Sequence, residues 1–100
     1  MIVLSSGNHR SDLRADFEYG AVYDFLGSGG TIAVMGWIYN DGDAYASGTV
    51  HFRIFDGYSW HDRNVPTGGV QAGGQIAFAW YEHFDQMDPD RVQVRWTLTA

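Results

Sequence analysis

Apolar or aromatic side chains occupy every second position from Leu13 to Phe25, and this alternation constrains the fold more than any other feature of the chain. Side chains of a β-strand point alternately to its two faces, so such a run places one face on a protein core. Its neighbours, such as Asp16 and Glu18, then point toward water. Four later segments repeat the same two-residue period. The chain is therefore predicted to be all-β.

Clusters of Gly, Asn, Asp, Ser and Pro, residues 66–69 among them, are expected to form turns between the strands. The segments that they separate predict seven strands, at residues 2–5, 14–26, 31–40, 47–55, 58–64, 75–84 and 91–99. Many short strands without alternating helices favour an antiparallel, immunoglobulin-like β-sandwich that occupies residues 1–100 as a single domain. The residues in phase on these strands form the predicted core: Phe17, Tyr19, Val34, Ile38, Val50, Phe52, Ile54, Ile76, Phe78, Trp80, Val92, Val94, Trp96 and Leu98.

The composition allows such a core and excludes some partners. Four Trp, six Tyr and six Phe supply enough apolar area for a sandwich of 100 residues without disulfides, and the chain contains no Cys. Twelve acidic residues face six scattered Arg and no Lys, for a formal charge of −6, so nucleic acid is not an expected partner. The apolar run Met1–Leu4 is too short for a membrane span and lacks the features of a signal peptide.

Three motifs follow one another in an order that resembles a known kind of module. They are the sequences GWIYN at residues 36–40, FRIFDG at residues 52–57 and GGQIAF at residues 73–78. Over residues 31–98, this order is similar to the FxLYD and CARDB families, although Ile54 and Phe55 replace the Leu and Tyr of those families and residues 72–74 replace Pro-Gly-Glu. The resemblance implies an immunoglobulin-like sandwich that acts as a non-catalytic module in secreted or surface proteins. It implies no active site.

Two acidic loops carry the residue types that calcium prefers. Asp41 and Asp43 belong to one loop, whereas Asp85, Asp88 and Asp90 belong to another. Turn formation explains these residues equally well. Consecutive loops alternate between the two ends of a sandwich, so the two clusters are expected at opposite ends. No metal site is therefore predicted.

No combination of titratable residues predicts catalysis. Ser59, His61 and Asp62 are close in sequence, but residues two apart on a strand do not form a catalytic triad. The four histidines lack metal-binding spacing and are expected on the surface or hydrogen-bonded in the core: His9, His51, His61 and His83. We expect neither enzymatic activity nor a cofactor.

Tyr58, Trp60 and His61 form an aromatic edge next to a turn. Exposed flat rings of this kind stack on sugars in many sandwich modules. The alternative is that Trp60 folds inward over the end of the core. A carbohydrate-binding module is therefore the second functional hypothesis.

Strand 31–40 is apolar on both faces, which a lone sandwich does not require. Such a strand is typical of a surface that another subunit covers, although single Trp and Tyr side chains also tolerate water. The predicted interface consists of Met35, Trp37, Tyr39, Phe55 and Tyr81, with strand 2–5 a candidate for exchange between copies. The leading hypothesis is a homo-oligomer, or an assembly with other protein subunits, in a surface filament, a virion or an adhesion-type protein. An extracellular surface or a virion is the favoured location.

Overall fold

The computed structural model describes residues 3–5 and 12–100 of the chain, and these residues form strands and loops but no helix. The strands are β1 (Val3–Ser5), β2 (Asp12–Tyr23), β3 (Gly30–Asn40), β4 (Ala46–Phe55), β5 (Trp60–Val70), β6 (Gln75–Phe84) and β7 (Gln93–Thr99). Every pair of neighbouring strands is antiparallel. The prediction of an all-β, antiparallel fold is confirmed.

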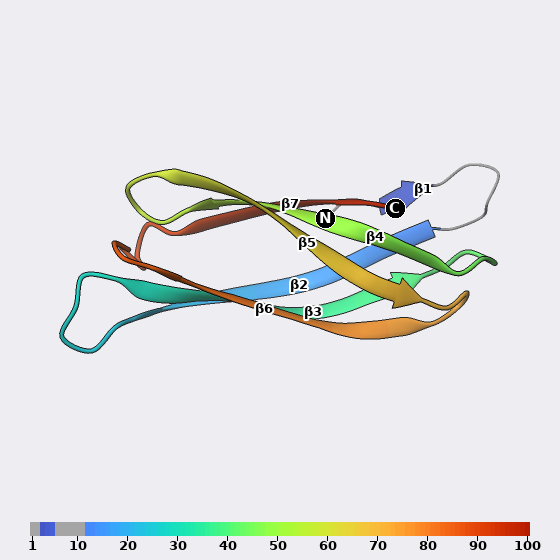
Figure 1. Ribbon diagram of the computed structural model, residues 1–100, viewed down its shortest axis with the longest axis horizontal. Coiled ribbons are helices and arrows are strands. Elements are labelled where there is room, and N and C mark those ends of the chain that lie inside the picture. The colour runs from blue at the N-terminus through green and yellow to red at the C-terminus, as the bar shows by residue number, and fades with distance from the viewer. Residues whose placement is uncertain (1–2, 6–11) are drawn as a thin grey trace.

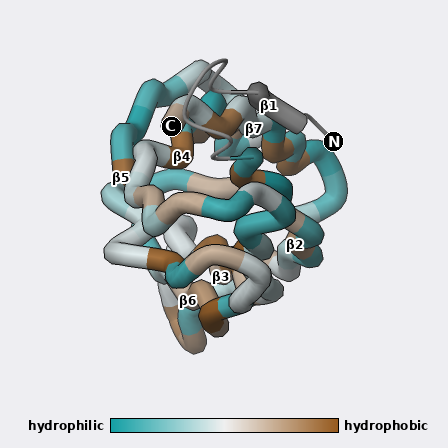
Figure 2. Tube along the Cα trace, turned by 90° about the vertical axis from the view of Figure 1, so that its right-hand side faces the viewer, coloured by the Kyte–Doolittle hydropathy of each residue, from teal (hydrophilic) through white to brown (hydrophobic). Residues whose placement is uncertain are grey.

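The strands form two sheets that pack face to face. One sheet has the order β1-β2-β3-β6 and the other has the order β5-β4-β7. Figure 2 shows the two layers from one end, with β4, β5 and β7 above β2, β3 and β6. The molecule is elongated, with extents of 50 × 20 × 17 Å, and β5 runs diagonally across it in Figure 1.

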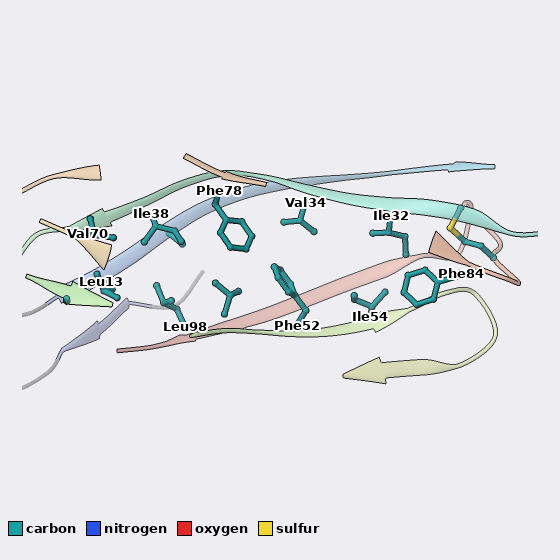
Figure 3. Packing of buried hydrophobic residues seen from close by; sticks show 14 residues of the cluster. Leu13, Ile32, Val34, Ile38, Phe52, Ile54, Val70, Phe78, Phe84 and Leu98 are labelled. Atoms are coloured by element: carbon teal, nitrogen blue, oxygen red, sulfur yellow. The ribbon is translucent and has the colours of Figure 1, made fainter. Parts of the chain in front are cut away.

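Apolar side chains from both sheets interdigitate between the layers, as Figure 3 shows. Phe52 of β4 stacks on Trp80 of β6, with ring centroids 4.9 Å apart and planes at 11°. Phe17 of β2 contacts Trp96 of β7 edge to face at 4.8 Å. The buried apolar residues are Leu13, Ala15, Ile32, Val34, Ile38, Ala46, Val50, Phe52, Ile54, Val70, Phe78, Phe84, Met87 and Leu98. Ile76, Val92, Val94, Trp80, Trp96 and Phe17 are partly buried against them.

Tyr19 was expected in this core, and that prediction is wrong, because its side chain is 51% exposed. Tyr19 has the same phase on β2 as the partly buried Phe17. However, β1 pairs with β2 only from Asp12 to Arg14, so β2 is an edge strand beyond that point. One flank of Tyr19 is therefore open to water.

The β2–β3 hairpin reaches furthest along the long axis, at the left of Figure 1. Its tip contains Phe25 and Leu26, each 91% exposed. Leu26 has a φ of 62°, in the left-handed region that non-glycine residues rarely adopt. The alternation that predicts a strand to residue 26 therefore continues past the core into a turn.

Strand β5 continues to Val70, through the segment 66–69 that the sequence predicts to be a turn. The register between β4 and β5 shifts between Gly48 and Thr49, so a β-bulge accommodates the segment. Thr67 is buried there, and its hydroxyl accepts a hydrogen bond from the Gly48 N–H at 2.9 Å. Because β5 is an edge strand, Pro66 is tolerated although it has no N–H to donate.

Candidate functional site

The outer face of the β2-β3-β6 sheet is largely apolar across its centre. The register places Asp16, Trp37 and Ala77 side by side in one row. Glu18, Met35 and Ala79 form the next row. We call this surface the Trp37 face; its residues are Asp16, Glu18, Ala33, Met35, Trp37, Tyr39, Ala77, Ala79 and Tyr81.

Large apolar side chains on the Trp37 face are exposed. Met35 is 52% exposed, Trp37 is 44% exposed and Tyr81 is 61% exposed, whereas Tyr39 is half-buried. The small side chains of Ala77 and Ala79 leave a hollow of about 600 Å³ beside Met35 and Trp37. The carboxylates of Asp16 and Glu18, from β2, line one side of this hollow. The Trp37 face therefore combines an apolar hollow with negative charge along one edge.

Arg14 fixes one corner of the Trp37 face. Its guanidinium lies over the Tyr39 ring, 4.2 Å from the centroid, and donates two hydrogen bonds to Asp41 at 2.7 and 3.2 Å. The hydrogen bond from Arg14 lowers the pKa of Asp41, and the same bond raises the pKa of Arg14. The positive charge of Arg14 is thus neutralised mainly by Asp41.

Phe55 does not extend the Trp37 face, contrary to the sequence prediction. It lies at the end of β4, in the other sheet, where its ring packs against Trp60 with centroids 5.1 Å apart. Both rings belong to the outer face of the β5-β4-β7 sheet. We call this second surface the Trp60 face; its residues are His51, Arg53, Phe55, Trp60, Asp62, Asn64, Arg95 and Thr97.

The Trp60 face holds two arginines next to each other. Arg53 of β4 pairs in register with Arg95 of β7, and like charges directly opposite each other destabilise a sheet. Each guanidinium lies 5.2 Å from the centroid of the Trp60 ring, and the Nε of Arg53 is 3.9 Å from Asp62. A hollow of about 550 Å³ lies beside them. This arrangement presents positive charge around an aromatic ring that is 39% exposed.

His61 does not share a face with Trp60, so the predicted edge of Tyr58, Trp60 and His61 is incomplete. Its ring packs on Phe84 with centroids 4.8 Å apart, at the end of the core. The Nε2 of His61 is 2.7 Å from the buried carboxylate of Asp56. Tyr58 is 62% exposed but lies in the turn before β5.

Asp56 organises this turn and does not form a catalytic triad with Ser59 and His61. Its carboxylate accepts the N–H groups of Tyr58 and Ser59 at 2.7 and 2.8 Å. Burial alone would raise the pKa of Asp56, but the hydrogen bonds from His61, Ser59 and Tyr58 together hold this pKa below its usual value. The Ser59 hydroxyl and Asp56 both contact the same nitrogen of His61, at 3.4 and 2.7 Å, whereas a triad uses the two different ring nitrogens.

The acidic loops lie at opposite ends of the sandwich, as predicted. Gly30 of β3 pairs with Phe84 of β6, and Tyr39 pairs with Gln75, so loop 41–45 and loop 85–92 start from opposite ends of this strand pair. Within residues 3–5 and 12–100, no group of three or more His, Asp or Glu side chains could hold a metal ion.

Strand β1 pairs with β2 within the chain, with Val3 opposite Arg14 and Ser5 opposite Asp12. Exchange of strand 2–5 between copies stays a prediction, and residue 2 is outside the described residues. The part of the chain that the structure describes contains no helix with the length and apolar character needed to cross a membrane. No protein-family model matches the chain, and neither a curated protein nor a solved structure shows significant similarity to it.

Proposed function

We propose that this protein is a non-catalytic structural module that assembles with further protein subunits through the Trp37 face. One observation carries the proposal: strand β3 is apolar on both sides, and its outer side exposes Met35 and Trp37 beside a hollow. A sheet with one wet side places polar residues there. Contiguous exposed apolar surface with polar residues at its border is typical of protein-protein interfaces.

The composition of the Trp37 face supports this proposal. Trp, Tyr and Met are enriched in interfaces because they bury large areas at low entropic cost, and Trp37, Tyr39, Tyr81 and Met35 gather on this surface. Carboxylates occur at one edge rather than at the centre. An apolar centre with a charged border is the usual anatomy of a binding surface.

The proposed fold is an immunoglobulin-like sandwich, in line with the resemblance to the FxLYD and CARDB families. The chain crosses between the sheets from β3 to β4, from β5 to β6 and from β6 to β7. As a result, β6 pairs with β3 and β7 pairs with β4, which is the kind of connectivity that Greek-key sandwiches share. We propose that this chain is a subunit of a surface filament, a virion or an adhesion-type protein.

The test is light scattering coupled to size exclusion, over a wide range of protein concentration. Wild-type protein is expected to increase in mass with concentration, and Trp37→Ala is expected to remain monomeric with an unchanged melting temperature. Tyr58→Ala removes an aromatic ring that is similarly exposed but lies outside the Trp37 face, so it should assemble like the wild type. A wild-type protein that stays monomeric at every concentration would overturn the proposal.

Carbohydrate binding is the second candidate, because Trp60 presents an exposed ring with two guanidiniums near it. Such a site would suit an acidic polysaccharide. Titration with neutral and acidic polysaccharides should then change the Trp fluorescence of the wild type and not that of Trp60→Ala. An unchanged spectrum of the wild type would eliminate this candidate.

A further inference from the structure

We propose that the partner of the Trp37 face is the Trp60 face of a second copy of this chain, so that copies stack head to tail. This inference rests on the proposed function and specifies its partner. Its basis is the complementarity of the two outer surfaces of one sandwich. One surface is apolar with two carboxylates at its edge, and the other is aromatic with two guanidiniums beside a single carboxylate.

The charges on the Trp37 face are negative. Asp16 and Glu18 point outward from β2 and line the hollow beside Met35 and Trp37. Among the described residues, neither carboxylate forms an ion pair, because Arg14 is engaged with Asp41. Carboxylates at the edge of an apolar surface favour a partner that brings cations to the same border.

The charges on the Trp60 face are positive, although the whole chain has a formal charge of −6. Two guanidiniums, from Arg53 and Arg95, face one carboxylate, from Asp62, which is 3.9 Å from Arg53. Arg95 forms no ion pair within the described part of the chain, and its guanidinium lies over the Trp60 ring. An arginine pair in register destabilises the isolated sheet. An incoming carboxylate pair would relieve that repulsion.

The spacing of the two pairs is compatible. Asp16 and Glu18 are two residues apart on one strand, which separates their Cα atoms by about 6.6 Å. Arg53 and Arg95 lie opposite each other on adjacent strands, about 5 Å apart at Cα, so this pair runs across its strands whereas the carboxylate pair runs along one, and the two copies meet with their strands crossed. Each guanidinium of one copy can therefore meet one carboxylate of the other. The Trp60 and Phe55 rings then contact the apolar hollow beside Met35.

The two contacting surfaces are the two outer faces of the sandwich. The sheets stack along the 20 Å axis of the molecule, so each outer face spans 50 × 17 Å. Because the two contacting surfaces differ and lie on opposite sides of the molecule, the contact is heterologous and does not close after two copies. The expected product is an open stack, not a symmetric dimer.

The test uses two charge-reversed proteins and their mixture. Asp16→Arg with Glu18→Arg makes both outer faces positive, whereas Arg53→Glu with Arg95→Glu makes both outer faces negative. Each protein alone is expected to assemble at least about tenfold more weakly than the wild type. An equimolar mixture restores both complementary contacts and should assemble again, as alternating copies. Recovery in the mixture also shows that both variants are folded.

A milder pair of variants covers the case in which charge reversal prevents folding. Asp16→Asn with Glu18→Gln keeps the side-chain shapes, and Arg95→Gln replaces the charge with a neutral polar group. Each should weaken assembly and reduce its dependence on salt. Two further variants complete the set. Asp62→Asn removes the only carboxylate of the Trp60 face and should strengthen assembly. Trp37→Ala should remain monomeric, as in the test of the proposed function.

The outcomes separate this inference from the proposed function. If the charge-reversed proteins assemble like the wild type while Trp37→Ala does not, the Trp37 face binds a different surface. The head-to-tail pairing is then wrong and the proposed function stands. A mixture that fails to assemble also overturns the pairing, provided that circular dichroism shows both variants folded. If Trp37→Ala assembles as well as the wild type, the proposed function fails too.

Discussion

Arg63 of β5 and Glu82 of β6 connect the two sheets along one side of the sandwich. The Nε and Nη2 atoms of Arg63 donate to the Glu82 carboxylate, at 2.8 and 2.5 Å, in a bidentate arrangement that is partly buried. The guanidinium also lies 6.0 Å from the centroid of the Phe84 ring. These contacts hold the edge of β5 against the edge of β6, where no backbone hydrogen bonds join the sheets.

A double-mutant cycle with Arg63→Met and Glu82→Gln should give a coupling energy of about 1–2 kcal/mol. This value exceeds that of an ordinary surface pair because the geometry is bidentate and half-buried, but solvent screening limits it. Urea unfolding of the four proteins measures the coupling, and added salt should reduce it. A coupling energy near zero would mean that side-chain packing, not the ion pair, joins β5 to β6.

Gly36 allows β2 and β3 to approach closely. A Cβ at this position would overlap the carbonyl oxygen of Asp16, so Gly36→Ala must displace one strand and should cost about 2–3 kcal/mol. Gly20→Ala is the matched control, because nothing lies within 4 Å of its added Cβ. Its effect on the free energy of unfolding should stay within about 0.5 kcal/mol. Equal destabilisation by both variants would contradict the steric explanation.

Phe52 is 2% exposed and contacts the rings of Phe17, Phe78 and Trp80 from the opposite sheet. Phe52→Ala removes these contacts and leaves a cavity, so the free energy of unfolding should fall by about 3–5 kcal/mol. Phe52→Leu should cost less, because it fills most of the volume. Calorimetric melting compares the variants, and a small loss for Phe52→Ala would mean that the sheets collapse to fill the space.

The hydrogen bond from His83 to Asp24 predicts a dependence of stability on pH. That bond raises the pKa of His83 above its ordinary value of about 6.5. The stabilisation is therefore fully present below the unfolded-state pKa and is lost as the pH rises through the higher folded-state pKa. Urea midpoints measured from pH 5 to pH 9 should fall over this window for the wild type. His83→Gln should abolish that fall, and an unchanged profile in the variant would assign it to another group.

Strand β6 shows what periodicity can predict. The alternation of Ile76, Phe78 and Trp80 predicts strand 75–84, and β6 has these bounds. Strand β5 shows the limit, because the residues that predict a turn at 66–69 instead lie in a bulge opposite Gly48 and Thr49. A bulge depends on the partner strand, and periodicity within one strand carries no information about its partner.

The same limit applies to the candidate site. Alternation on β3 correctly groups Met35, Trp37 and Tyr39 on one side, but it does not reveal which strands lie beside them. Phe55 was added to this group although it belongs to the other sheet, whereas Tyr81 was added correctly because β6 pairs with β3. Met87 was missed in the core because it lies in a loop, where no period exists, although it is only 1% exposed.

The pairing of distant strands also determines how quickly this chain can fold. Strand β3 meets β6 with Gly30 opposite Phe84, and β4 meets β7 with Thr49 opposite Thr99. Each of these two strand pairings must bring together segments that are far apart in the chain before its contacts form. Proteins with such topology therefore typically fold in milliseconds to seconds. The β4–β5 hairpin needs no such closure and can form within roughly 1–10 μs. Until β6 and β7 return to their partners, the apolar sides of β3 and β4 stay in water, and this interval is when the chain is most prone to aggregate.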